Sequence, residues 1–370
     1  MGGGEDSSRE HLLIILPKMF EEYVAVVKKK HPLFKVTFYP QEKVPRDLPG
    51  AGHGDGIFPP DLFQDVTILV TLFALPPHPS ECPKLQLIHF VSAGTNHVVK
   101  SPIYTDTDIT LTTSSGIHGP QIAEWVLMTL LSHVHYQKGL LKWQSEHKWA
   151  QYEDMPAVAD LVGQRFGVLG YGSIGRQAAR AAKAMGMDVI AYTAGPRDTP
   201  ESKKDKGFIV PGTGDADGTI PSAWYSGSDK ESLHHFLKQD IDVLLVSVPL
   251  TPATRHLLGA AEFDLLGRTK NTFISNISRG QIVDQAALIR ALKQPVAEGG
   301  LRGAALDVTD PEPLPRDSEL WDLDNVQVTP HISGRGIAYS ERSFQVLELN
   351  LQKRARGEKL INVVDRRRGY

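Results

Sequence analysis

The sequence predicts an α/β protein built from two doubly wound parallel-sheet domains. Short apolar runs with β-branched residues alternate with segments of helical periodicity along the chain, which is typical of parallel sheets. The length of 370 residues exceeds that of one ordinary domain, so two domains are expected. A long helical segment that begins at Pro120, a favourable first helical residue, lies between the two stretches of alternation and suits a connector.

The first third of the chain contains four predicted strands and one helix before the connector. The strands cover residues 11–16, 34–39, 67–72 and 85–91. The helix covers residues 19–30, where Phe20, Val24 and Val27 recur at a spacing of three to four. The connector helix from Pro120 is expected to run for about twenty residues. Its apolar stripe consists of Ile122, Val126, Leu127, Leu130, Leu131 and Val134.

The second half of the chain repeats the alternation more clearly. Six strands are predicted, at residues 165–169, 188–192, 243–248, 272–276, 303–308 and 326–330. Helices are predicted at residues 174–185, 232–238, 260–266 and 284–293. Residues 198–229 are rich in Gly, Pro, Ser and Asp and are too many for an ordinary connection, so we expect a surface insertion there.

Composition excludes several classes of protein. Hydrophobic residues make up 41% and charged residues 22%, and the net charge is −3, so a basic field for nucleic acid is not expected. Cys82 is the single cysteine, which excludes a disulfide scaffold and favours a reducing compartment. No apolar run has the length of a membrane span, and the first residues lack the features of a signal peptide. We therefore expect a cytoplasmic protein without membrane or nucleic-acid partners.

The clearest local motif is the sequence FGVLGYGSIGR at residues 166–176. A predicted strand precedes it and an alanine-rich helix follows, which is the context of a dinucleotide-binding loop. Gly170 permits the tight turn, Gly172 lets the backbone approach a pyrophosphate, and Gly175 lets the helix pack on the strand. Ser173 and Ile174 open the helix whose backbone N–H groups would meet the phosphates. The alternative is an ordinary strand-to-helix turn with incidental glycines.

The end of the next predicted strand bears on the choice of cofactor. NAD enzymes place an acidic residue there to hold the ribose hydroxyls, but residues 193–197 read TAGPR and contain none. Arg197 can bind a 2′-phosphate through a bidentate contact, which a carboxylate would repel. With Thr193, it predicts NADP(H) as the cofactor. NAD(H) remains the alternative, with Arg197 pointing to solvent.

Three chemically useful residues follow three of the later predicted strands. Arg279, Glu312 and His331 would converge because ligands bind at the carboxyl ends of strands in an open parallel sheet. Arginine can align a 2-keto acid, histidine can supply a proton, and a carboxylate orients the ring and favours its charged form. The pairs His133/His135 and His234/His235 have the wrong spacing for a metal site, so no metal is expected.

These motifs resemble the D-isomer-specific 2-hydroxyacid dehydrogenase family. The matching pieces are residues 91–98, the helix start at 123–125, residues 170–176, residues 248–251 with Thr254, residues 279–280, residues 307–312 and residues 330–331. The resemblance implies a Rossmann nucleotide-binding domain at residues 118–334, inserted into a flavodoxin-like substrate domain made of residues 1–117 and 335–370. It also implies a homodimer. The cofactor loop is similar to that of the NADP-using glyoxylate and hydroxypyruvate reductases.

The resemblance also assigns roles to individual residues. Arg279, Glu312 and His331 take the catalytic positions. Backbone N–H groups of Ala93 and Gly94, together with Arg279 and His331, would bind the substrate. Asp307 would hold the nicotinamide carboxamide. The other cofactor-binding positions it implies are Val248, Pro249, Thr254, Ile277, Ser278, Arg279, His331, Ser333 and Gly334.

The expected function is hydride transfer between NADP(H) and a 2-keto acid/D-2-hydroxy acid pair. Leu72, Phe73 and Trp149 are candidates for an apolar substrate pocket, with core packing as the alternative. Two other functions remain open. A formate dehydrogenase shares the fold, but its pattern has Gln where Glu312 stands. A nucleotide-sensing corepressor of the same fold can keep all three catalytic residues.

Overall fold

The structure is a computed structural model, and it describes residues 10–41, 58–59, 61–95 and 97–367. The chain divides into two compact units. One unit comprises His118–Gly336, and the other comprises the residues before and after that range. Each unit is an α/β structure with its own parallel sheet. The predicted fold class of two doubly wound parallel-sheet domains is confirmed.

The first unit is built on a five-stranded sheet. Its strands are β1 (His11–Leu16), β2 (Lys35–Pro40), β3 (Ile68–Thr71), β4 (Leu87–Phe90) and β5 (Thr110–Thr113). The order is β2-β1-β3-β4-β5 and every neighbouring pair is parallel. This is the flavodoxin-like order, in which the direction of winding reverses between β1 and β3.

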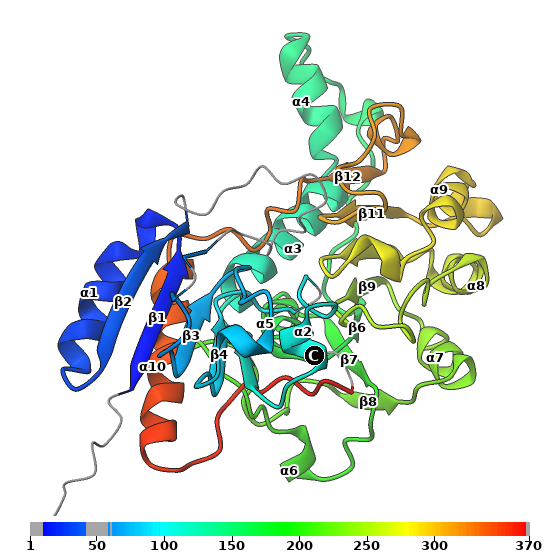
Figure 1. The fold of residues 1–370 in the computed structure, drawn as a ribbon. Coiled ribbons are helices and arrows are strands. Elements are labelled where there is room, and N and C mark those ends of the chain that lie inside the picture. Colours follow the sequence, from blue (N-terminus) through cyan, green and yellow to red (C-terminus); the bar gives the residue numbers. More distant parts are fainter. Residues whose placement is uncertain (1–9, 42–57, 60, 96, 368–370) are drawn as a thin grey trace, which may run out of the picture. The chain divides into compact units, whose positions relative to one another are not determined.

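Helices cover both faces of this sheet, which explains why β1 is apolar at every position. On one face, Leu12, Ile14 and Leu16 pack against α1 (Glu21–Lys30) and α10 (Tyr339–Ala355). These two helices lie side by side although they come from opposite ends of the chain (Figure 1). On the other face, Leu13 and Ile15 pack in a cluster that includes the short α2 (Pro102–Thr105).

The second unit is built on a seven-stranded parallel sheet with the order β12-β11-β10-β9-β6-β7-β8. Its strands are β6 (Arg165–Leu169), β7 (Asp188–Thr193), β8 (Ala223–Ser226), β9 (Val243–Val246), β10 (Phe273–Asn276), β11 (Gly303–Leu306) and β12 (Val326–Val328). The winding reverses between β6 and β9, so the dinucleotide motif, which follows β6, lies at the switch point.

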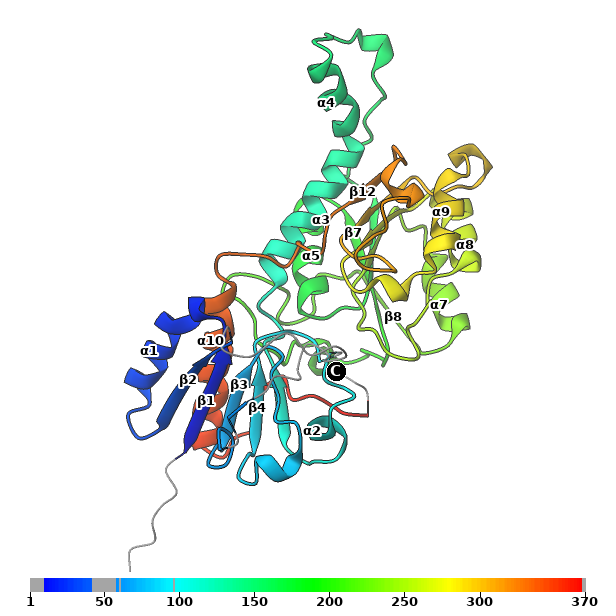
Figure 2. The same ribbon diagram turned by 45° about the horizontal axis from the view of Figure 1, so that its top comes forward.

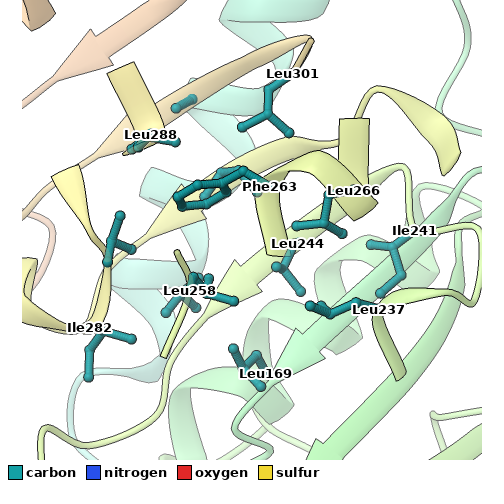
Figure 3. Close-up of a cluster of buried hydrophobic side chains, with 14 of the residues drawn as sticks. Leu169, Leu237, Ile241, Leu244, Leu258, Phe263, Leu266, Ile282, Leu288 and Leu301 are labelled. Carbon is teal, nitrogen blue, oxygen red and sulfur yellow. The ribbon is translucent and has the colours of Figure 1, made fainter. Parts of the chain in front are cut away.

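Two helices cover one face of this sheet and three cover the other (Figure 2). The first pair is α3 (Gly119–Val134) and α5 (Ser173–Ala184), whose Ala178, Ala179 and Ala182 pack closely on the strands. The other three are α7 (Lys230–Leu237), α8 (Ala260–Lys270) and α9 (Gln285–Lys293). Figure 3 shows Phe263 of α8 in the core of that second layer, among Leu244, Leu266 and Leu288. Because these helices cover the faces of the sheet, a binding site is expected at the carboxyl ends of its strands.

The connector differs from its prediction. The prediction of a single helix of about twenty residues from Pro120 is wrong, because α3 ends at Val134 and a separate helix, α4 (Gln137–Ser145), follows. Tyr136 between them has a left-handed backbone, with φ 55°. A Cβ at Gly139 would lie 1.9 Å from the Tyr136 ring, so glycine at this position lets the ring fold back onto α4. Helix α4 projects from the body of its unit (Figure 2).

Residues 198–229, predicted to be a surface insertion, contain regular elements that the sequence did not predict. They contain α6 (Pro200–Lys203) and end in β8, which pairs with β7 as the edge of the sheet.

Short 3-10 helices complete the described elements: η1 (Lys18–Phe20), η3 (Pro79–Glu81), η4 (Tyr152–Asp154), η5 (Gly280–Ile282), η6 (Val296–Glu298) and η7 (Glu319–Trp321). None of the helices in the described part of the chain is long and apolar enough to cross a membrane.

Candidate functional site

His331 and Glu312 form a hydrogen-bonded pair of chemically active side chains in the second unit. His331 follows β12 and has a left-handed backbone, with φ 54°. Its Nδ1 lies 2.6 Å from Oε1 of Glu312, and both side chains remain partly exposed. A carboxylate only accepts, so Nδ1 carries the proton and donates it to Glu312. Nε2 is then the ring nitrogen that can exchange a proton with a substrate.

Asp307 holds the loop that carries His331. It follows β11 and is buried, with 1% of its surface exposed. Its Oδ1 accepts hydrogen bonds from Thr329 Oγ1 (2.6 Å) and Ile332 N (2.9 Å). Its Oδ2 accepts bonds from the backbone N–H (2.9 Å) and the hydroxyl of Ser333. Four donors use the acceptor capacity of a carboxylate, so these contacts support a loop-holding role rather than the expected contact with the nicotinamide carboxamide.

Arg279 lies beside Glu312 on the neighbouring loop. It follows β10, and its Nη1 donates to the carbonyl of Ser278 at 2.7 Å. Burial lowers the pKa of Arg279, and the negative charge of Glu312 opposes that shift. A Cβ at Gly280 would lie 1.9 Å from the carbonyl oxygen of Thr309, so only glycine lets this loop pack against the segment that leads to Glu312. The structure therefore brings Arg279, Glu312 and His331 together from β10, β11 and β12.

The glycine-rich loop after β6 has the features of a phosphate cradle. Gly170 has φ 103°, and a Cβ there would lie 2.7 Å from the backbone carbon of Ser247. A Cβ at Gly175 would lie 2.5 Å from the carbonyl oxygen of Gly170. At Gly172, by contrast, a Cβ would meet no described atom within 4 Å. Gly172 is also the N-cap of α5, so the helix begins with backbone donors that no capping side chain covers, which suits a pyrophosphate.

The predicted adenine side lies at the end of β7. Thr193 Oγ1 donates to the carbonyl of Gly195 at 2.7 Å, and the position of a Cβ on Gly195 is open. Arg197 is partly buried, and its Nη1 donates to the carbonyl of Ser202 at 2.5 Å. The guanidinium thus lies along α6 instead of pointing freely into solvent. Its remaining N–H groups are chemically suited to a phosphate.

The other predicted cofactor positions cluster after β9 and β10. The hydroxyl of Ser278 donates to the carbonyl of Val248. Thr254 Oγ1 donates to the carbonyl of Pro249 at 2.7 Å and accepts from Thr251 N at 2.8 Å. Ile277 is buried beside Ser278. Gly334, two residues beyond Ile332, accepts a bond from Gln121 at 3.2 Å. These loops all follow strands on the carboxyl edge of the sheet.

The predicted substrate-carboxylate donors belong to the first unit. Ala93 and Gly94 follow β4, and Ser92 Oγ donates to the carbonyl of Gly94 at 2.9 Å. On the neighbouring loop after β3, the ring of Phe73 contacts His97, whose Nε2 lies 2.9 Å from the carbonyl oxygen of Leu72. Asn96 lies outside the described residues. Trp149 is 93% exposed, so the alternative that it packs in a core is wrong.

Within the described ranges, no group of three or more His, Cys, Asp or Glu side chains could hold a metal ion.

Comparison with known proteins identifies the family. The sequence model of the "D-isomer specific 2-hydroxyacid dehydrogenase, NAD binding domain" matches residues 127–210 and 219–333, more than half of the chain. The chain belongs to this family. It is an NAD(P)-dependent oxidoreductase of the 2-hydroxyacid dehydrogenase type, as the motifs predicted.

Individual relatives of this dehydrogenase extend over most of the chain. A glyoxylate reductase of Korarchaeum cryptofilum is 29% identical over 286 residues, which are 76% of this chain and 77% of the relative. A D-isomer specific 2-hydroxyacid dehydrogenase of Xanthobacter autotrophicus, solved with NADPH and MES, is 27% identical with a TM-score of 0.72, covering 97% and 99% of the two chains. An NADPH-dependent glyoxylate/hydroxypyruvate reductase of Sinorhizobium meliloti, solved with NADP and sulfate, is 26% identical with a TM-score of 0.70, covering 98% and 100%.

Sequence reasoning did not identify every residue that shapes the site of this dehydrogenase. Tyr171 lies between two of the glycines but was not assigned a role, because no motif fixes the residue type there. Asp215 accepts a hydrogen bond from its hydroxyl at 2.8 Å, and this partner is 44 residues away in the sequence. The only local signal is an acidic residue flanked by glycines, which is typical of any surface turn.

Proposed function

We propose that this dehydrogenase reduces a 2-keto acid to a D-2-hydroxy acid with NADP(H). The observation that carries the proposal is the 2.6 Å hydrogen bond between His331 and Glu312, next to Arg279 and in the same unit as the glycine-rich loop. The unit His118–Gly336 is proposed as the nucleotide-binding domain and the other unit as the substrate domain. A keto acid needs a cation to align it and a proton for its oxygen, and these side chains supply both.

Each catalytic side chain has a distinct task in this proposal. When bound, the cofactor supplies the hydride that reduces the keto carbon. His331 donates the proton from Nε2 to the substrate oxygen, while Nδ1 stays bonded to Glu312. Glu312 holds the ring in that tautomer and stabilises the charged imidazolium. Arg279 binds the negatively charged substrate, and the backbone N–H groups of Ala93 and Gly94 are proposed as donors to its carboxylate.

The cofactor would occupy the loops on the carboxyl edge of the seven-stranded sheet. The pyrophosphate would be held by Gly172, Ser173, Ile174 and Gly175. The adenosine side of the cofactor would be held by Thr193 and Arg197. Residues 193–197 contain no acid to repel a 2′-phosphate. The relatives from Xanthobacter autotrophicus and Sinorhizobium meliloti were solved with NADPH and NADP. These observations favour NADP(H) over NAD(H).

The substrate class follows from the relatives and from the loop after β3. Relatives named for glyoxylate and hydroxypyruvate act on small 2-keto acids, so we propose a substrate of that size. Leu72 and Phe73 are partly buried, and the Phe73 ring lies beside the ring of His97, so an apolar wall for a small substrate is proposed here. Since Cys82 is the single cysteine and is buried, the reducing cytoplasm is the proposed location.

A turnover assay tests this function directly. Purified protein is mixed with a panel of 2-keto acids that includes glyoxylate and hydroxypyruvate, and oxidation of NADPH and of NADH is followed at 340 nm. His331→Ala removes the general acid and should lower kcat by about 10²–10⁴-fold. Glu312→Gln, which loses a charged hydrogen bond, should lower kcat by about 10- to 150-fold.

Two outcomes would contradict the proposal. Tight binding of NADPH without turnover of any keto acid would favour the nucleotide-sensing corepressor. Activity of His331→Ala equal to that of the parent would show that this residue is not the proton donor. Glu319→Gln, which breaks an exposed ion pair with Lys293, is the matched control and should retain full activity.

We also propose that the protein is a homodimer. Apolar side chains are exposed on α4 and on the connection that follows it, notably Leu141, Trp149, Tyr152 and Val162. Large apolar side chains exposed on and after a projecting helix are typical of a protein interface. Replacing Leu141 and Trp149 by Glu should convert a dimer to a monomer in analytical ultracentrifugation, whereas Met19→Glu, an exposed apolar residue of the first unit, should not. A monomeric parent protein would contradict the proposal.

A further inference from the structure

Residues 211–218 form a segment that the family model does not match. The model matches residues 127–210 and 219–333, and these eight residues lie between the two matched stretches. An unmatched loop usually lies free on the surface. This one does not, because Gly214, Asp215 and Gly218 are buried. The side chains that bury it come from the glycine-rich loop and from the first turns of α5.

Asp215 is the centre of these contacts. Its Oδ2 accepts hydrogen bonds from the hydroxyl of Tyr171 (2.8 Å) and from Ile220 N (3.1 Å), and its Oδ1 accepts a bond from Thr219 N (3.0 Å). Tyr171 stands between Gly170 and Gly172 and is 4% exposed. Burial, followed by the bond to Asp215, raises the pKa of Tyr171, so the hydroxyl stays protonated and remains a donor. The carboxylate therefore holds the single large side chain of the loop.

Arg176, in the first turn of α5, makes a second connection. Its Nη1 donates to the carbonyl of Asp215 and its Nη2 to the carbonyl of Lys203, each at 2.6 Å. Its guanidinium also lies 5.0 Å from the centre of the Tyr171 ring, within range of a cation–π interaction. The helix that would receive the phosphates is thus tied to the 211–218 segment at its first turn.

Two further contacts fix the segment itself. Gly214 N donates to Oε1 of Gln177 at 2.6 Å, which adds a bond to the next residue of α5. Gly218 has φ 67°, and a Cβ there would lie 2.5 Å from the carbonyl oxygen of Lys203. Glycine at this position lets the segment close onto the end of α6. The segment is therefore held on either side of Asp215, at Gly214 and at Gly218, while it holds Tyr171.

A loop with three glycines is free to adopt many backbone conformations when nothing holds it. Binding a cofactor to such a loop requires that its backbone be ordered, which weakens the affinity. A loop already held in the binding conformation avoids that loss. Since neither Asp215 nor Tyr171 has an exposed side chain, their effect on a bound cofactor must pass through the backbone of the loop.

We propose that Asp215 is a positioning residue that holds the pyrophosphate-binding loop in its binding conformation before the cofactor arrives. The proposal rests on the proposed function, because it requires that this loop receive the cofactor pyrophosphate. The 211–218 segment then acts as a brace on the loop, with Tyr171 and Arg176 as the two points of attachment.

Stopped-flow binding of NADPH, followed by its fluorescence, tests this inference. In Asp215→Ala the fraction of molecules with a competent loop falls, and a fall to about one tenth weakens the apparent Kd by about tenfold. The loss should appear as a slower association rate with an unchanged dissociation rate, because the bound complex keeps all its direct contacts. Accordingly, KM for NADPH should rise while kcat at saturation stays near that of the parent.

Tyr171→Phe removes only the hydroxyl and keeps the ring in place, so it tests the same bond with little risk to folding. It should show a smaller slowing of association in the same direction. Asp242→Asn is the matched control, because this carboxylate accepts a backbone bond from Arg165 N at 2.7 Å at the opposite, amino edge of the sheet. It should lower Tm without changing the association rate.

The outcomes separate this inference from the proposed function. NADPH binding by the parent protein decides whether the loop is a cofactor site at all. If the parent binds NADPH and both variants associate at the parent rate, Asp215 is merely a structural residue and the inference is wrong. A faster dissociation with an unchanged association rate would also overturn it, because that result would indicate a direct contact with the cofactor.

Discussion

Arg197 donates from Nη1 to the carbonyl of Ser202, which holds its guanidinium along α6 at the end of β7. An arginine held in this way has already lost much of its side-chain conformational entropy. Binding a phosphate would therefore require little further loss of entropy. Lys204, which also lies in this region, pairs with Glu201 at 2.9 Å and is the weaker candidate for a phosphate ligand. We therefore expect recognition of a 2′-phosphate to depend most on Arg197.

Arg197→Ala is expected to raise KM for NADPH and to leave KM for NADH almost unchanged. Loss of a charge-assisted hydrogen bond corresponds to about 1.5–3 kcal/mol, or about 10- to 150-fold in KM. Steady-state kinetics with each cofactor measure the effect, and Lys204→Ala serves as the control. If Arg197→Ala left KM for NADPH unchanged while Lys204→Ala raised it, Lys204 rather than Arg197 would be the phosphate ligand. Preference of the parent for NADH would refute recognition of a 2′-phosphate.

At the scale of the element, the loop from Thr329 to Ser333 is the part of the site whose shape depends on one buried side chain. His331 has a backbone conformation that residues with a Cβ rarely adopt, and such a conformation persists only when its surroundings hold it. Asp307 provides that hold through four donors: the hydroxyl of Thr329 before His331, and after it Ile332 N together with the N–H and hydroxyl of Ser333. The direction of the imidazole therefore depends on Asp307.

Asp307→Asn should lower kcat by about 10- to 100-fold. The NH2 group of the new side chain is itself a donor and would face the N–H and hydroxyl donors of the loop, which misplaces the His331 ring. If Asp307 only positions the loop, KM for NADPH should change little. Thr329→Val, which removes one of the four donors, should have a smaller effect in the same direction. A raised KM for NADPH with an unchanged kcat would instead support the contact with the nicotinamide carboxamide.

Local patterns predicted most elements but not those whose stability comes from distant partners. The apolar runs of β1, β6 and β9 were recognisable because strands buried on both faces are apolar throughout. β8 was missed inside the expected insertion because its sequence AWYS is short and half-exposed as an edge strand. α10 was not predicted, and its mean hydropathy is low because only one stripe is buried. The break at Tyr136 depends on the fit of its ring over Gly139.

The candidate site likewise contains residues that local patterns could predict and residues whose roles depend on distant partners. Arg279, Glu312 and His331 could be found from the sequence because each follows a recognisable strand and carries side-chain chemistry that the reaction needs. Asp307 was found, but its partners were not, since four donors from one loop cannot be read from a spacing. Arg366 belongs to no recognisable motif, yet its guanidinium donates to the carbonyls of Thr107 and Ile109 and lies near the ring of Tyr104.

At the scale of the whole molecule, burial affects the titration of a histidine in each unit: His89 of the first unit is fully buried and His133 of the second is partly buried. His89 of β4 lies between Thr112 Oγ1 (3.0 Å) and Ser114 Oγ (3.2 Å), and burial lowers its pKa to about 4. His133 of α3 packs on the Phe273 ring, and burial, with Arg302 and Lys138, lowers its pKa to about 4 as well. In the unfolded chain both rings titrate near 6.5.

Stability should therefore fall as the pH drops below about 6.5, because the unfolded chain then binds protons that the folded chain excludes. For one such histidine the loss between neutral pH and pH 5 is about 2 kcal/mol in the free energy of unfolding. Urea denaturation at pH 7.5 and pH 5 measures it. His89→Asn should reduce the difference between the two values, and an equal difference in parent and variant would contradict the assignment.

The last part of the chain completes the sheet formed by the first part. Phe344, Leu347 and Leu351 of α10 cover Leu12 and Ile14, and Val363 pairs antiparallel with Thr112 at the free edge of β5. During synthesis these residues leave the ribosome after the whole of His118–Gly336. The second unit can thus fold while the first still exposes an apolar face and an open strand edge, a state prone to aggregation. We expect the unit that is translated first to reach its native state last, under the protection of chaperones.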